Sequence, residues 1–121
     1  MQQTYPSTEK LKQKTHISSL FQEGKSVSAS PLRLIFLPLE LADSPIKFGV
    51  SVPKKHHKKA VDRNYLKRVL RECYRKNKSL LLPHVGQGFL FMMVYQSAET
   101  LTYAEIELKT QEVFQKWTLR K

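Results

Sequence analysis

The sequence predicts an α+β protein, an α/β sandwich in which helices pack against a small mixed sheet. Residues 46–52 alternate between apolar and polar side chains, as a half-buried strand does. Residues 89–95 (FLFMMVY) form an uncharged apolar run, which is typical of a strand covered on both faces and therefore central to its sheet. Between these strands, in residues 59–78, basic and apolar side chains recur at helical spacing. Two strands joined by a crossover helix indicate helices packed on a sheet.

The elements around this unit follow from local signals. Ile17, Leu20 and Phe21 share one face of a first helix, which we expect to begin at the N-cap Thr15 and to end at Gly24. Residues 32–39 are rich in branched and aromatic side chains and predict a strand that ends near its proline.

Turn-forming residues at 42–45 separate this strand from the alternating one, so we expect the two strands to pair as a hairpin. The sequence TYAE at 102–105 is a capping box that opens a last helix.

Length and composition limit the organisation of the chain. Its 121 residues suit one domain, and 40% hydrophobic residues favour a folded globule. Residues 1–13 are polar and lack periodicity, so we expect a flexible basic N-terminal arm before a single domain at 14–121.

Two further features concern the compartment. The single cysteine, Cys73, excludes an intramolecular disulfide and is interpreted as a small buried hydrophobe. We find no apolar stretch suited to a signal peptide or to a membrane span of about 18 to 20 residues, and therefore expect a cytoplasmic protein without a membrane partner.

The positive charge is concentrated in one segment. Eleven of the 21 Lys and Arg residues lie between Lys54 and Lys78, against only Asp62 and Glu72, so this segment carries +9 of the net charge of +11. Neighbouring cations at helical spacing repel each other by about 0.2 to 0.5 kcal/mol per pair. The arginines among them can bind phosphate through two parallel hydrogen bonds. A nucleic acid is therefore a better explanation than a solvated charged face.

An autonomous nuclease is the alternative that His56 and His57 raise, because a histidine pair can act as general base and acid. Adjacent side chains point in different directions, and no third group is placed to orient them. We interpret both as surface residues or as helpers in phosphate binding. The scattered acidic residues form no paired carboxylates, so we expect no catalytic residue and no metal site in the protein.

Residues 60–71 (AVDRNYLKRVLR) resemble the signature of the bacterial ribonuclease P protein component, in which Arg-Asn, Lys-Arg and a further Arg follow an Ala. The flanking sequences at 48–55 (FGVSVPKK) and 10–24 also resemble this family, so the likeness extends from about residue 10 to 117. Three positions depart from the family pattern. Tyr65 replaces a usual third basic residue and lies on the apolar half of the helix, Ile17 replaces an aromatic residue, and His57 replaces an apolar one.

The resemblance implies a four-stranded mixed sheet with about three helices, in the order α-β-β-β-α-β-α, with a left-handed β-α-β crossover. It also implies a protein subunit that assists a catalytic RNA in removing the 5′ leader from precursor tRNA. The RNA subunit would bind the Mg²⁺ ions, and the protein would hold no tightly bound cofactor and need no obligate protein partner. A ribosomal protein or general RNA chaperone is the alternative.

Residue by residue, the resemblance implies two binding surfaces. The basic helix and the loop before it would dock on the catalytic RNA, and a cleft between the first helix and the sheet would hold the single-stranded leader. The expected RNA-binding residues are Lys54, Lys55, Lys59, Arg63, Asn64, Lys67, Arg68 and Arg71, and the expected leader-binding residues are Phe21, Arg33 and Phe36.

Overall fold

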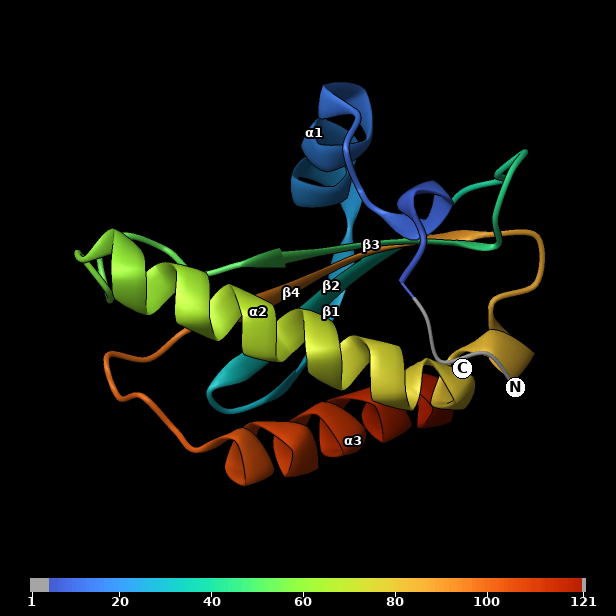
Figure 1. The fold of residues 1–121 in the computed structure, drawn as a ribbon. Helices are drawn as coiled ribbons and strands as arrows, with labels where there is room; N and C mark the ends of the chain where they lie inside the picture. Colours follow the sequence, from blue (N-terminus) through green and yellow to red (C-terminus); the bar gives the residue numbers. More distant parts are fainter. Residues whose placement is uncertain (1–4, 121) are drawn as a thin grey trace.

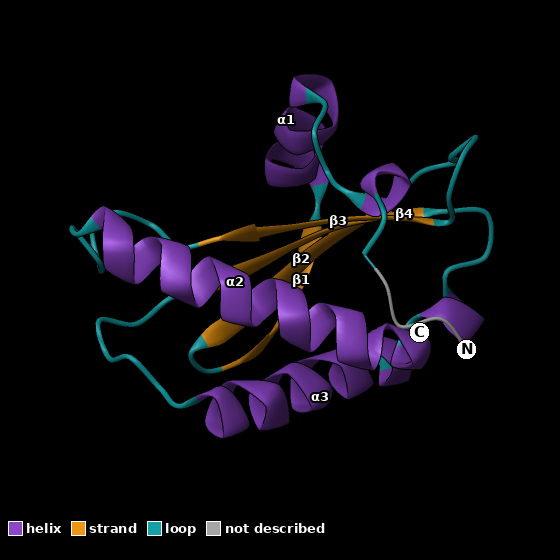
Figure 2. Cartoon of the chain, in the orientation of Figure 1, coloured by secondary structure: helices purple, strands orange, loops and turns teal. Residues whose placement is uncertain are grey.

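A four-stranded sheet forms the middle layer of the protein, whose computed structural model describes residues 5–120. Helix α1 (Lys14–Glu23) lies on one face of the sheet, and helices α2 (Ala60–Asn77) and α3 (Tyr103–Leu119) cover the other (Figure 1). Short 3-10 turns at Ser7–Glu9, Lys78–Leu80 and Leu82–His84 complete the helical structure (Figure 2).

The four strands are arranged in the order β1-β2-β4-β3. They comprise β1 (Lys25–Ala29), β2 (Leu32–Pro38), β3 (Ile46–Ser51) and β4 (Phe89–Tyr95). The pairs β1–β2 and β2–β4 are antiparallel, whereas β3 and β4 are parallel and joined through α2. This arrangement confirms the α+β class, the mixed four-stranded sheet and the order α-β-β-β-α-β-α.

The predicted hairpin between the strands at 32–39 and 46–52 is wrong. β4 lies between β2 and β3 and pairs with both of them. All seven residues of β4 are buried, so this strand is stable only where it has cover on both faces and a neighbour on each side. The partner of β2 in a hairpin is instead β1, whose sequence KSVSA is largely exposed at the sheet edge and carries little strand signal.

Most element boundaries agree with the sequence prediction. The capping box is confirmed, because the Glu105 amide donates to Thr102 Oγ1 at 3.2 Å and the Thr102 amide donates to the Glu105 carboxylate at 3.0 Å. The expected N-cap Thr15 is wrong, since the N-cap is Gln13, two residues earlier, and α1 begins at Lys14. Gly24 does follow α1, where a Cβ would lie 2.3 Å from the Leu20 carbonyl oxygen.

Two apolar clusters lie on opposite faces of the sheet. The larger one fills the space between the sheet and helices α2 and α3, where Phe48 stacks on Tyr74 with ring centroids 4.0 Å apart. Cys73 is buried in this cluster, as the sequence predicted. The smaller cluster contains Leu20 from α1 and Ile35 from β2. The face under α1 is therefore less completely covered than the face under α2 and α3.

Residues 5–13, which we expected to belong to a flexible arm, are held to the domain. The Glu9 carboxylate accepts hydrogen bonds from Tyr74 Oη at 2.7 Å and from the buried Lys78 Nζ at 3.0 Å. The Leu11 amide donates to the Phe48 carbonyl at 3.1 Å. The remaining residues of the expected arm, 1–4, lie outside the described part of the chain.

Candidate nucleic-acid interface

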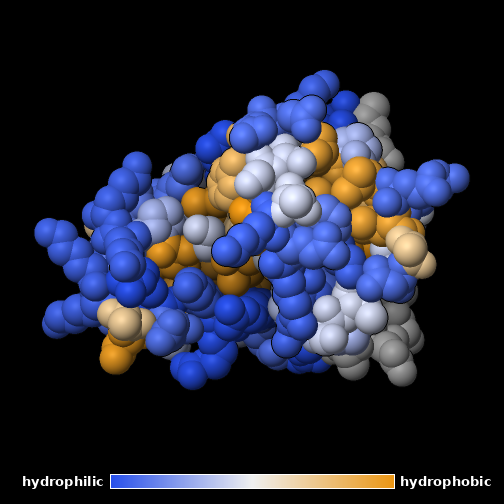
Figure 3. All heavy atoms as spheres, turned by 90° about the horizontal axis from the view of Figure 1, so that it is seen from above, coloured by the Kyte–Doolittle hydropathy of each residue, from blue (hydrophilic) through white to orange (hydrophobic). Residues whose placement is uncertain are grey.

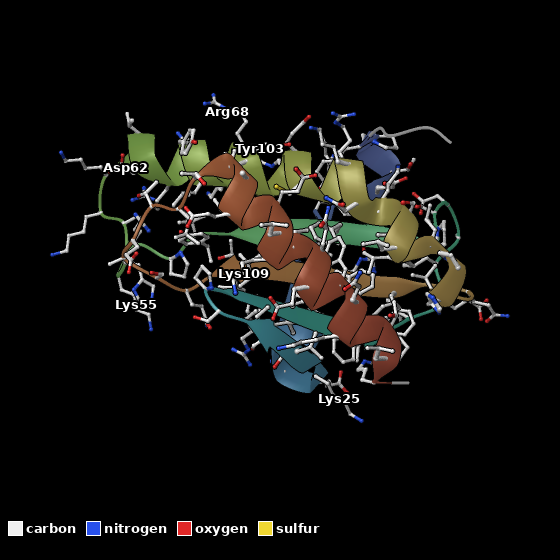
Figure 4. All side chains as sticks on the ribbon, turned by 90° about the horizontal axis from the view of Figure 1, so that it is seen from below. Lys25, Lys55, Asp62, Arg68, Tyr103 and Lys109 are labelled. Atoms are coloured by element: carbon white, nitrogen blue, oxygen red, sulfur yellow. The ribbon has the colours of Figure 1, made fainter. Side chains whose placement is uncertain are left out.

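The basic residues of α2 and of the loop before it form one surface. The first turns of α2 extend beyond the end of α3 (Figure 1), and Arg68 points outward from the helix (Figure 4). We call this set the basic surface: Lys54, Lys55, Lys59, Asn64, Arg68 and Arg71 are exposed, and Arg63 and Lys67 are half-buried. Among residues 5–120, none of its cations forms an ion pair with a carboxylate. Its charge is therefore available to an external polyanion.

The loop that carries Lys54 and Lys55 is fixed at its base. His57 is buried, with Nε2 2.7 Å from the Ser97 carbonyl oxygen and its ring edge against Tyr95 at 5.8 Å between centroids. The interpretation of His57 as a surface residue is therefore wrong, because its ring anchors the loop to the end of β4. A fixed loop holds its lysines in place before any partner binds.

Arg63 has a structural role in addition to its place in the basic surface. Its Nη1 donates to the carbonyl oxygens of His57 at 3.0 Å and of Lys58 at 2.8 Å. The guanidinium therefore joins the first turn of α2 to the preceding loop. One guanidinium nitrogen of Arg63 is used within the protein. We therefore expect Arg63 to have fewer N–H donors available for RNA than Arg68 or Arg71.

Two of the cations near the C-terminal end of α2, Arg75 and Lys78, belong to the protein's own ion pairs. Arg75 forms an ion pair with Glu72, and this guanidinium lowers the pKa of the Glu72 carboxyl below its ordinary value. Lys78 is buried against Glu9. Most of the free positive charge of the segment therefore lies in its N-terminal two thirds, and the exposed Lys76 adds one cation near the C-terminal end.

A hollow of about 310 Å³ opens between α1 and the sheet, beside the basic surface. It has cations at its rim and apolar or backbone surface within, and it is lined by Tyr5, Lys10, Leu11, Lys12, Ile17, Gly49, Val50, Arg71 and Met92. Viewed from the α1 side, apolar atoms lie between hydrophilic side chains (Figure 3). Burial raises the pKa of the Tyr5 phenol to about 12, so this side chain is neutral. Cations around an apolar floor suit a single nucleic-acid strand.

Two of the three residues expected in the leader-binding cleft lie on the α1 side of the molecule. Phe21 on α1 is 55% exposed and lies one turn after Ile17, on the same face of the helix. Arg33 alternates with core-facing neighbours along β2 and therefore faces the α1 side, where its Nε donates to Ser26 Oγ at 3.2 Å. Both positions are compatible with a ligand on this side of the sheet.

The expectation for Phe36 is wrong. Its side chain is 3% exposed and lies in the larger cluster, on the face of the sheet opposite α1. It packs edge-on against Trp117 at 6.3 Å, and the Arg120 guanidinium lies 4.0 Å from its ring centroid. Phe36 lies three residues after Arg33 in the same strand, and side chains at this spacing point to opposite faces of the sheet, so the two residues could not line one cleft.

Most of the residues that line the hollow could not be recognised from the sequence. Lys10 and Lys12 come from the segment that was expected to be flexible, and Val50 and Met92 were recognised only as strand residues. The family resemblance did imply a cleft between the first helix and the sheet, and it drew attention to Ile17 and Arg71, which both line the hollow. Backbone pairing of Lys10 with Phe48 brings these distant segments together.

The described residues also provide negative findings. No group of three or more His, Cys, Asp or Glu side chains within 5–120 is arranged to hold a metal ion. In the same part of the chain, no helix combines the length and the apolar character needed to cross a membrane.

Comparison with known proteins identifies the family. The model of the family described as Ribonuclease P matches residues 5–118. The chain belongs to the ribonuclease P protein family. A relative from Microcystis aeruginosa is 37% identical over 86 residues, which cover 69% of this chain and 68% of the relative. A relative from Porphyromonas gingivalis is 41% identical over 75 residues, which cover 61% of this chain and 55% of the relative's length. Both are ribonuclease P protein components.

Solved structures of ribonuclease P proteins share this fold. The Staphylococcus aureus protein matches with a TM-score of 0.75 at 21% identity, covering 90% of this chain and 94% of the other. The Thermotoga maritima protein matches with a TM-score of 0.72 at 24% identity, covering 89% of this chain and 96% of the other. The agreement confirms the three-helix, four-stranded architecture on which the basic surface is placed.

Proposed function

We propose that this protein is the RNA-binding subunit of a cytoplasmic ribonuclease P, which assists a catalytic RNA in removing the 5′ leader from precursor tRNA. The observation that carries the proposal is the basic surface, whose cations have no carboxylate partner among the described residues. Membership of the family supports the same role. The basic surface would dock on the catalytic RNA, and Lys54, Lys55 and the exposed arginines of α2 would contact its phosphates.

The hollow between α1 and the sheet is the proposed site of the single-stranded leader. Its rim carries Lys10, Lys12 and Arg71, which suit phosphates, while Ile17 and Met92 provide apolar surface for bases. Phe21 and Arg33 lie on the same side of the sheet and would extend this contact. Arg71 belongs both to the basic surface and to the hollow, so the two RNA molecules would meet near this residue.

Electrostatics explains how such a protein would assist the reaction. Two polyanions that approach each other repel, and cations placed between them reduce this repulsion by displacing condensed counterions. The protein would thereby raise affinity for the leader and lower the Mg²⁺ concentration that the catalytic RNA needs. The bond chemistry and its Mg²⁺ ions would belong to the RNA, and no catalytic residue is assigned to the protein.

Reconstitution tests this proposal. Purified protein, a catalytic RNA of the ribonuclease P type and precursor tRNA are combined at low Mg²⁺, and each macromolecule is omitted in turn. We expect 5′-leader removal to be stimulated only when the protein and the catalytic RNA are both present. Cleavage by the protein alone would indicate an autonomous nuclease. Binding without preference for precursor over mature tRNA, and without stimulation, would indicate a ribosomal protein or a general RNA chaperone.

A further inference from the structure

The N-terminal half of α2 carries apolar side chains that the core does not cover. Val61 is 77% exposed and Tyr65 is 38% exposed, although helical spacing places both on the half of the helix that also contains the buried Leu66 and Val69. These side chains are exposed because the first turns of α2 extend beyond the beginning of α3, so that α3 does not cover them (Figure 1). Tyr65 lies on the apolar half of the helix, as expected, but the core does not cover its side chain.

A hollow of about 320 Å³ lies beside Tyr65, between α2 and the first turn of α3. We call it the tyrosine hollow, and it is lined by Tyr65, Arg68, Val69, Glu72 and Tyr103. The Arg68 guanidinium carbon lies 5.7 Å from the centroid of the Tyr65 ring. Figure 4 shows Arg68 on α2 next to Tyr103 at the start of α3. Two aromatic rings and an arginine thus surround one opening.

The surroundings of the tyrosine hollow favour an anionic ligand with an apolar ring. Arg68 is part of the basic surface, and Lys76 Nζ lies 5.2 Å from the Tyr103 ring centroid. Glu72 also lines the hollow, but its carboxylate accepts a hydrogen bond from Arg75 Nε at 3.1 Å and its charge is compensated. An apolar or acidic protein segment would satisfy only part of this environment, whereas a nucleotide supplies both a flat ring and a phosphate.

We propose that the tyrosine hollow binds one unpaired nucleobase of the catalytic RNA, an inference that rests on the proposed function. The base stacks on the Tyr65 ring, and Arg68 contacts the adjoining phosphate. Aromatic rings next to arginines are the surfaces on which splayed-out bases stack. The volume lies near the lower end of the range for small-ligand sites, about 300 to 1,000 Å³, which suits one ring system. A basic residue at position 65 would make an electrostatic contact with the RNA. Tyr65 makes a stacking contact in its place.

Binding of the full protein to the catalytic RNA, measured by filter retention across a salt series, tests this inference. Stacking of one base is worth about 1 to 3 kcal/mol, so Tyr65→Ala is expected to weaken binding by about 5- to 150-fold. Tyr65→Phe keeps the ring and is expected to bind as the wild type does. The matched control is Leu108→Ala, which removes an exposed apolar side chain from α3, away from the tyrosine hollow. Thermal melting checks that every variant is folded.

The salt dependence separates stacking from charge. Tyr65→Ala removes no cation, so it is expected to keep the wild-type slope of log K against log salt, whereas Arg71→Ala is expected to reduce it. If Tyr65→Ala binds as the wild type while Arg71→Ala binds more weakly, the inference is overturned and the proposed function stands. A loss in Tyr65→Phe equal to that in Tyr65→Ala also overturns it, because the ring is then not the contact. Failure of the wild-type protein to bind the catalytic RNA overturns both.

Discussion

The Arg71→Ala variant is a direct test of the basic surface. Arg71 is exposed, has no ion pair with a carboxylate among the described residues, and lines the hollow next to α1. Loss of a charged hydrogen-bond partner costs about 1 to 3 kcal/mol. We therefore expect the variant to bind the catalytic RNA about 5 to 150 times more weakly at moderate salt.

The salt dependence of the same binding equilibrium provides a second quantitative prediction, the slope of log K against log salt. The basic surface contains seven cations, and each phosphate that one of them neutralises adds about −0.9 to the slope of log K against log salt. If all seven contact phosphate, the wild-type slope is about −6, and Arg71→Ala makes it shallower by about one. The assay is filter binding at fixed Mg²⁺ over a range of KCl concentrations.

Lys109→Ala is the matched control, since Lys109 lies on α3 and pairs with Glu112 at 3.5 Å (Figure 4). We expect this variant to keep both the affinity and the slope of the wild type. An Arg71→Ala protein with unchanged affinity and slope would refute the argument that the basic surface is the RNA dock. Equal losses in both variants would show that overall charge, and not its position, determines binding.

Three further predictions address the leader, the fold and the pH dependence. Phe21→Ala should lower affinity for precursor tRNA by about 1 to 3 kcal/mol, the value of one stacked base, and spare mature tRNA in a direct binding assay. Glu9→Ala leaves the buried Lys78 without this carboxylate and should lower the free energy of unfolding by about 3 to 5 kcal/mol in denaturant titrations. The Thr102 amide and hydroxyl lower the pKa of Glu105 below 4.5, so the capping contribution of its carboxylate is complete above pH 4.5 and is lost as pH falls through the lowered value. Thr102→Val should raise this pKa towards 4.5 in an NMR titration.

These three predictions have separate controls. For Phe21→Ala, equal losses for precursor and mature tRNA would indicate a role in folding and not in leader binding. Glu99→Ala removes an exposed carboxylate, so a loss of stability equal to that of Glu9→Ala would contradict the importance of the buried pair. For Glu105, an unchanged pKa in Thr102→Val would show that the side-chain hydroxyl does not contribute to the shift.

Local pattern predicted the three α-helices and three of the four strands closely. The basic helix was expected at 59–78 and runs from Ala60 to Asn77, and β4 has the predicted boundaries. These elements depend on periodicity, capping and burial, which are written into consecutive residues. The same property explains why the basic surface could be located from the sequence, because its residues lie close together along the chain.

The errors concern contacts between distant segments. The pairing of β4 between β2 and β3, and the docking of residues 5–13, depend on partners more than 35 residues away. The exposure of Tyr65 depends on where α3 begins relative to α2, which helical spacing does not encode. For Phe36, strand alternation already places it opposite Arg33, and only the choice of which face lies under α1 depends on the layer arrangement.

The chain by itself therefore determined the family, all the secondary structure except β1 and the short 3-10 turns, and the location of unbalanced charge, since each is carried by neighbouring residues. Tertiary structure alone decided which cations remain free, where the two hollows open and which aromatic rings reach solvent. The physical reason is that exposure and pairing are properties of side chains brought together by packing, and packing is specified by the whole sequence at once.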